Sequence, residues 1–180
     1  MLETNPSSVT PSAATSTIPA GNGGTFIRVT EVWQVDTGGN RLIRTSGIYG
    51  DLHDFAAVSG NESFAFGEGL PGRTWSEQRP LVLKSFNPET FKRTEAAHAA
   101  GLTSGISLPI FRGGTFVGVV VFLCAADEDT IGAVEVWSND AMSGEIMALS
   151  DGYFGAAKHF EWISKHTTFP RGMGLPGGVW

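Results

Sequence analysis

Cysteine is almost absent from this sequence. Cys124 is the single cysteine among 180 residues, so no disulfide framework and no cysteine-based metal cluster can form within the chain. Long apolar runs are also missing, since none approaches the ~18 residues of a membrane-spanning helix. Positive charge is scarce, because 12 Lys and Arg stand against 18 Asp and Glu, giving a net charge of −6. We therefore expect neither nucleic acid nor a membrane as a partner.

Residue groupings typical of active sites are missing as well. No serine and histidine form a hydrolase-type elbow, and the acidic residues are scattered along turns. The four histidines lack the spacing of metal ligands. We therefore expect a protein that is not an enzyme and has no metal site, and the sequence names no cofactor. The Met-Leu-Glu start lacks the basic and apolar parts of a secretory signal, which favours a soluble cytoplasmic protein.

What the sequence does contain is a repeat. The phrase Gly-Glu-Gly-Leu-Pro-Gly-Arg-Thr-Trp over 67–75 returns as Gly-Met-Gly-Leu-Pro-Gly-Gly-Val-Trp over 172–180, which is 105 positions later. The triplet Glu-Val-Trp at 31–33 returns at 135–137. The offsets differ by one residue, which places the extra residue in a polar turn where insertions cost little. We expect one fold written twice, with the second copy only half present and the chain a fragment of a longer tandem protein.

The pattern along the chain divides it into three parts. Residues 1–24 are rich in Ser, Thr, Pro, Ala and Gly, and we expect a disordered tail there. Residues 25–126 form the first domain and 127–180 the incomplete second copy. In the first domain we expect strands over 25–35, 41–49, 81–86, 104–110 and 115–124, with helices over 51–58, 71–78 and 88–100.

Two of these elements carry specific expectations. Asn87 and Pro88 form a strong helix start, and Gly101 a helix stop. The run from Val117 to Leu123 is apolar on both faces, which predicts a central strand covered on both sides. In the second copy we expect strands over 131–138 and 146–154 and a helix over 156–165, and strand 131–138 is a candidate to pack beside the first sheet.

The ordered series of motifs in the first domain resembles the GAF domain family. The resemblance covers about 25–126, and its first half recurs at 131–180. It is carried by the following residues in sequence order: Gly69-Leu70-Pro71-Gly72, Trp75, Arg79-Pro80, Ala96 to Leu102, Leu108-Pro109-Ile110, Gly113-Gly114 and Gly118-Val119-Val120. The resemblance implies an α+β fold, with an antiparallel sheet of about five to six strands, flanking helices on one face and a ligand pocket on the other.

The family also implies a regulatory role, in which a module binds a small molecule such as a cyclic nucleotide or tetrapyrrole, dimerises, or signals to an adjacent effector domain. Several family features are missing here. Cys124 is not followed by the histidine of bilin-attaching relatives, and one cysteine is too few for the relatives that reduce methionine sulfoxide. The long helices that make parallel dimers in the family are not evident here, which argues against a homodimer through a helical stalk.

Six residues are candidates for lining a ligand pocket between the sheet and helix 88–100: Glu31, Phe64, Trp75, Phe91, His98 and Cys124. Four of them have a structural alternative, which for Cys124 is core packing at the end of its strand. Trp75 would serve either as a flat pocket wall or as a core anchor. Glu31 lies on an apolar strand face, where it would anchor a ligand, form a salt bridge at the sheet margin, for example to Arg44, or tilt outward. His98 points either into the pocket or into water.

Two functions remain open from the sequence. The first is a non-catalytic sensory module that binds an unknown small molecule and shifts the equilibrium of a neighbouring domain. The second is a ligand-free structural or dimerising module whose pocket is closed by its own side chains, since the open edges of an unfinished sheet seek partners.

Overall fold

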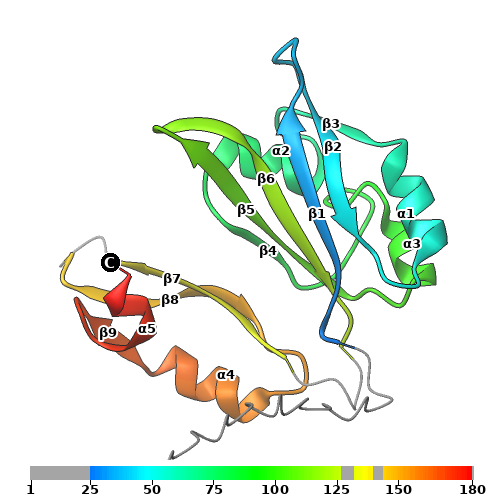
Figure 1. The fold of residues 1–180 in the computed structure, drawn as a ribbon. Coiled ribbons are helices and arrows are strands. Elements are labelled where there is room, and N and C mark those ends of the chain that lie inside the picture. The colour runs from blue at the N-terminus through cyan, green and yellow to red at the C-terminus, as the bar shows by residue number, and fades with distance from the viewer. Residues whose placement is uncertain (1–24, 127–131, 140–143, 180) are drawn as a thin grey trace, which may run out of the picture.

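The computed structural model describes residues 25–126, 132–139 and 144–179, which form two antiparallel sheets (Figure 1). The tail expected over 1–24 lies outside the described residues. No helix in the described part of the chain is both long and apolar enough to cross a membrane.

The larger sheet has six antiparallel strands in the order β3-β2-β1-β6-β5-β4. The α+β architecture expected from the sequence is thereby confirmed. The strands are β1 (Ile27–Val35), β2 (Arg41–Ile48), β3 (Ser63–Ala65), β4 (Leu81–Leu83), β5 (Ser104–Arg112) and β6 (Thr115–Cys124).

One face of this sheet carries the core. Alternation along β1 turns Val29, Glu31 and Trp33 inward, and all three are fully buried. The same face is covered by α1 (His53–Gly60), α2 (Gly69–Glu77) and α3 (Thr94–Ala99), whose apolar residues join the same cluster. The resemblance to the family had predicted helices on one face of the sheet and a ligand pocket on the other, and Glu31 is a candidate for lining a ligand pocket. The structure places the helices and the buried Glu31 on the same face.

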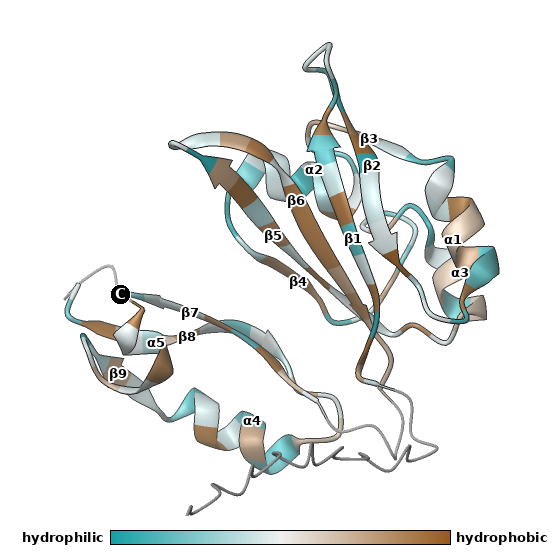
Figure 2. Ribbon diagram, in the orientation of Figure 1, coloured by the Kyte–Doolittle hydropathy of each residue, from teal (hydrophilic) through white to brown (hydrophobic). Residues whose placement is uncertain are grey.

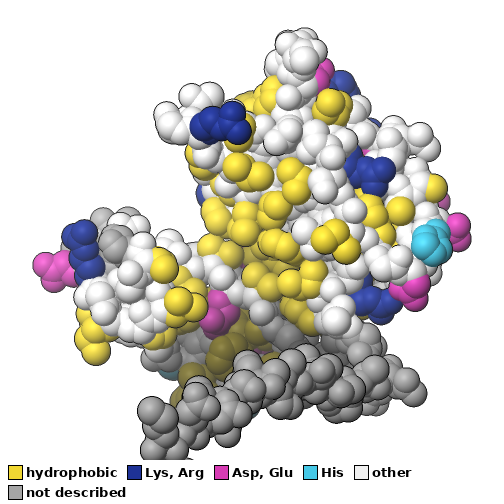
Figure 3. Space-filling model, in the orientation of Figure 1, with side chains coloured by type: hydrophobic (Ala, Val, Ile, Leu, Met, Phe, Trp, Pro, Cys, Tyr) yellow, Lys and Arg dark blue, Asp and Glu magenta, His cyan; other side chains and the backbone are white. Residues whose placement is uncertain are grey.

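The opposite face of the sheet carries no helix among the described residues. Strand β6 is central, as expected, because it pairs with both β1 and β5. Its coverage on both sides, however, is a wrong prediction: Val120 and the two residues that flank it, Val32 and Leu108, are only half-buried. Figure 2 shows that β5 and β6 are largely apolar along their length, and Figure 3 shows an apolar surface on this side of the sheet.

The helix expected over 88–100 is shorter than predicted. Asn87 does accept a hydrogen bond at its Oδ1 from the Thr90 backbone N–H at 3.0 Å, but the chain then forms turns, and α3 begins only at Thr94. The reason lies in Phe91 and Arg93, which are both buried. Residues two apart point to opposite sides of a helix, so a continuous helix would not bury both against one core.

The second sheet has three antiparallel strands in the order β7-β8-β9. It comprises β7 (Val134–Asn139), β8 (Ile146–Tyr153) and β9 (Thr168–Pro170), with α4 (Lys158–Lys165) and α5 (Gly174–Gly178) beside it. Strand 131–138 was a candidate to join the first sheet, but β7 pairs with β8 in a sheet of its own. The two sheets contact each other through an ion pair between Lys84 and Asp151 at 3.0 Å and through stacked rings of Phe26 and Tyr153.

The two parts share details of local geometry at the strand pair. A β-bulge separates Val32 from Trp33, and another separates Val136 from Trp137. After each bulge, the tryptophan indole N–H donates a hydrogen bond to the glutamate two residues before it, at 3.0 Å in the first sheet and 3.2 Å in the second.

The two glycine-rich turns also match. The backbone N–H of Gly67 bonds to the carbonyl oxygen of Gly72 at 2.8 Å, and that of Gly172 to Gly177 at 2.7 Å. A Cβ atom on Gly72 would lie 2.1 Å from a backbone oxygen, and one on Gly177 would lie 2.2 Å from the corresponding oxygen. Only glycine fits at either position, which explains why both phrases keep it.

Candidate functional site

The largest concentration of polar groups in the core surrounds Glu31, whose side chain is fully buried on β1. The guanidinium of Arg93 grips it with two hydrogen bonds, from Nη1 to Oε1 at 2.5 Å and from Nη2 to Oε2 at 2.9 Å. The Tyr49 hydroxyl donates to Oε1 at 2.8 Å, and Nη1 of Arg93 also donates to the hydroxyl of buried Ser59. The cluster therefore joins β1, α1 and the turns before α3.

Aromatic rings enclose the guanidinium of Arg93. Its central carbon lies 4.9 Å from the ring centre of Phe55, 5.2 Å from Phe91, 5.5 Å from Trp33 and 5.8 Å from Phe64. Contacts of this kind attract a cation to the ring faces, more strongly where water is excluded. The arginine therefore occupies an aromatic cage with a carboxylate at one end, as a bound cationic ligand would.

The charges of this cluster are mutually stabilised. Burial by itself would raise the pKa of Glu31, but hydrogen bonds and the positive charge from Arg93, with further bonds from Tyr49 and Trp33, hold that pKa below its usual range. The pKa of Tyr49 is raised by burial and by the neighbouring Glu31 carboxylate. Glu31 is therefore ionised and Tyr49 protonated at neutral pH, and neither is poised to exchange a proton there.

The structure brings three of the six predicted pocket residues together and leaves three elsewhere. Glu31, Phe64 and Phe91 surround Arg93. Trp75 is half-buried and stacks on Phe116, next to the core and away from this cluster. His98 is exposed on α3, and Cys124 is buried at the end of β6.

Sequence reasoning missed Arg93. The salt bridge considered for Glu31 named Arg44, but Arg44 instead donates to the hydroxyl of Tyr49 at 2.5 Å. One signal was available: a carboxylate on an apolar strand face requires a cation. The predicted helix over 88–100 pointed away from this pairing, because helical geometry would have turned the side chain of Arg93 away from that of Phe91.

Cys124 does not have the environment of a reactive thiol. It is fully buried, and burial raises the pKa of its thiol to about 12. We expect a thiol-specific disulfide reagent to modify the folded protein at least about 100-fold more slowly than the urea-denatured chain, since the thiolate is the reacting form. Absorbance of the released thiolate measures both rates, and equal rates would contradict the buried placement.

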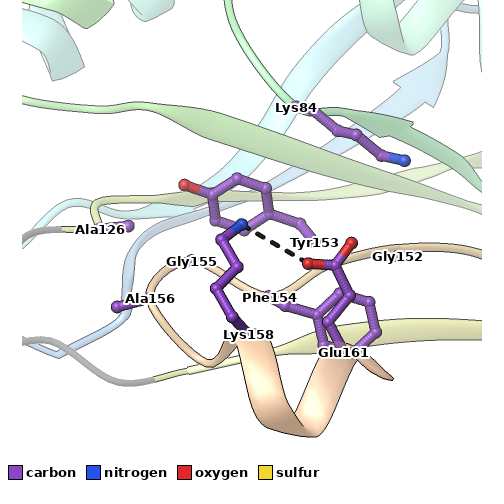
Figure 4. A pocket seen from close by; sticks show the side chains of 9 residues that line it. All are labelled: Lys84, Ala126, Gly152, Tyr153, Phe154, Gly155, Ala156, Lys158 and Glu161. Atoms are coloured by element: carbon purple, nitrogen blue, oxygen red, sulfur yellow. Dashed lines mark hydrogen bonds and ion pairs between the residues drawn. The ribbon is translucent and has the colours of Figure 1, made fainter. Parts of the chain in front are cut away.

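An open cavity, separate from the arginine cage, lies between the two sheets, where β8 approaches the loop after β4 (Figure 4). It has a volume of about 540 Å³ and is lined by Lys84, Ala126, Gly152, Tyr153, Phe154, Gly155, Ala156, Lys158 and Glu161. Lys158 pairs with Glu161 at 3.5 Å, the interaction drawn in Figure 4, and Lys84 pairs with Asp151. Both ammonium groups therefore already have carboxylate partners. No three His, Cys, Asp or Glu side chains within the described ranges are grouped as metal ligands.

The family model for the GAF domain matches residues 24–141, which includes the six-stranded sheet and the whole arginine cage. The chain belongs to the GAF domain family. GAF domains are generally regulatory or sensory modules, and the six-stranded antiparallel sheet of this chain lies within the matched residues. No curated protein matches the chain.

Three of the solved structures to which the chain is similar have TM-scores between 0.42 and 0.44. One is a free methionine-R-sulfoxide reductase from Neisseria meningitidis in complex with its substrate, at 19% identity over 54% of this chain and 52% of that one, with a TM-score of 0.42. Another is the GAF domain of a phosphoenolpyruvate-protein phosphotransferase from Coxiella burnetii, at 17% identity over 54% and 56%, with a TM-score of 0.44. A third is a Staphylococcus aureus NreA protein mutated in its nitrate-binding site, at 13% identity over 65% and 84%, with a TM-score of 0.44. The chain spans about half the length of the first two.

Proposed function

We propose that this chain is a non-catalytic regulatory GAF module that acts through protein contacts. The space in which a small molecule would bind is filled by the side chain of Arg93. The observation that supports this is the cage itself: a guanidinium fills the space among Trp33, Phe55, Phe64 and Phe91 and satisfies both oxygens of Glu31. A small molecule entering there would have to displace a buried, paired charge, which is costly.

The proposal extends to the second part of the chain. Residues 132–179 repeat the bulged Glu-Val-Trp strand, the glycine turn and the order strand, strand, helix, strand, helix of the first part. Trp137 also meets the ring of Phe169 edge-on at 4.9 Å, as Trp33 meets Phe64 at 4.8 Å. These likenesses support a second GAF-type unit, of which the described residues contain the counterparts of β1, β2, α1, β3 and α2.

Small-molecule sensing is the second candidate, and the cavity in Figure 4 is the observation that favours it. Its volume of about 540 Å³ falls in the range of ligand pockets, and its lining mixes apolar and charged groups. A ligand there would bridge the two sheets and couple its binding to their relative arrangement.

One thermal-shift screen tests both candidates, with cyclic nucleotides, haem and biliverdin as the probes. We expect none of them to raise the melting temperature of the wild-type chain saturably. A saturable shift that disappears in the Lys84→Met, Lys158→Met double variant would replace our proposal with sensing at the cavity between the sheets. A saturable shift that survives in that variant and perturbs Trp33 would contradict the closed hollow.

A further inference from the structure

The second sheet is open at a strand whose counterpart in the first sheet is paired on both sides. In the first sheet, β1 pairs with β2 on one side and with β6 on the other. Its counterpart β7 pairs only with β8 among the described residues, so it lies at the edge of a three-stranded sheet. An edge strand presents a row of backbone N–H and C=O groups to which another strand can bind.

A buried carboxylate oxygen at this edge lacks a partner. Oε2 of Glu135 accepts the indole N–H of Trp137, but Oε1 is buried and has no hydrogen-bond donor among the described residues. The corresponding atom of Glu31 receives bonds from Arg93 and Tyr49. Phe154 stands 105 positions after Tyr49 and has no hydroxyl to donate. Leaving such an oxygen unpaired costs free energy, and a cationic donor would remove that cost.

An apolar hollow of about 570 Å³ surrounds the same carboxylate. Trp137 and Phe169 line it together with Phe160 and Leu175, which are 45% and 82% exposed. The residues 105 positions earlier, Phe55 and Leu70, are 2% and 0% exposed. The second unit therefore leaves uncovered the surface that the first unit buries.

The first unit also shows what chemistry covers such a surface. Arg93 lies over Phe55, strand β6 pairs with β1 at Glu31 and Trp33, and α2, which contains Leu70, packs against β5 and β6. We infer that the open side of the second unit binds a polypeptide partner that lays a β-strand antiparallel along β7 and inserts an arginine against Glu135. This inference rests on the proposal that residues 132–179 form a second GAF-type unit.

Three observations favour this occupant over others. The free side of β7 requires main-chain donors and acceptors, which a polypeptide supplies and an apolar small molecule does not. The unpaired carboxylate oxygen requires a cation, and a guanidinium meets a carboxylate with two parallel hydrogen bonds. The hollow is lined by aromatic rings that match the surroundings of Arg93 in the first unit, and such rings favour a guanidinium.

The experiment uses the full chain and, as the probe, a polypeptide with the sequence of residues 80–126. This probe contains Arg93 and the β5–β6 hairpin. Hydrogen exchange followed by mass spectrometry would report on amides 134–139 of the chain. We expect saturating probe to slow their exchange by about 10-fold or more, because strand pairing protects edge amides. We expect Arg93→Met in the probe and Glu135→Gln in the chain each to weaken binding by about 10-fold, without adding to each other.

The matched control is Glu95→Gln in the probe, which alters the charge at a position exposed on α3 and should leave binding unchanged. The inference is overturned if the probe leaves amides 134–139 unprotected, or if the Arg93→Met probe binds as well as the original. It is also overturned if protection arises without the probe and increases with chain concentration, since a second copy then covers the edge. None of these results touches the closed hollow of the first unit, which the ligand screen tests separately.

Discussion

Replacing Arg93 with methionine is expected to destabilise the first unit by about 3–5 kcal/mol, the range for removing one partner of a buried ion pair. Methionine has a similar length and fills part of the cage, so the loss arises mainly from the carboxylate of Glu31, which stays buried without its cation. Chemical denaturation followed by circular dichroism measures the free energy of unfolding.

The double variant Glu31→Gln, Arg93→Met separates this effect from lost packing. A neutral glutamine keeps oxygen and nitrogen near Trp33 and Tyr49 but carries no charge to desolvate. We expect the double variant to be more stable than Arg93→Met alone by about 1–2 kcal/mol, within the range of coupling energies between contacting residues. Equal or lower stability of the double variant would mean that the charge pair is not what holds the cage together.

Leu70→Ala is expected to cost about 2–5 kcal/mol, whereas Leu175→Ala should change stability by no more than about 0.5 kcal/mol. The two leucines occupy the same place in the repeated Gly-Leu-Pro-Gly phrase, but Leu70 is 0% exposed and Leu175 is 82% exposed. Truncating the first leaves a cavity between α2 and the strands it packs on, and truncating the second leaves only water. Similar denaturation midpoints for the two variants would contradict the exposed placement of Leu175.

The sequence predicted the parts of the fold that depend on local pattern. The alternation around Glu31 and Trp33 placed both on the buried face of a strand, and Gly113-Gly114 placed the turn of the β5–β6 hairpin between Arg112 and Thr115. Each of these signals is contained within a few residues, so no tertiary information was needed to interpret it.

The centre of the candidate site was beyond such patterns. The hydrogen bonds between Arg93 and Glu31 join residues 62 positions apart, and no local spacing links them. The segment from Pro88 to Arg93 has the composition of a helix start, but burial of two side chains pulls it into turns. Tertiary packing overrode helix propensity there, and the residue that fills the cage was hidden by that error.

The pairing of β1 with β6 has a consequence for synthesis on the ribosome. Thr30 lies opposite Phe122, so 92 residues must be translated before the first strand meets its inner neighbour. At 5–20 residues per second this delay is roughly 5–20 s. During that time β2 is the only strand that can pair with β1, and Trp33 lacks the contacts that β6 later provides. A nascent chain of this kind exposes apolar surface to which chaperones bind. Arrest of translation before β6 would leave an aggregation-prone hairpin rather than a folded module.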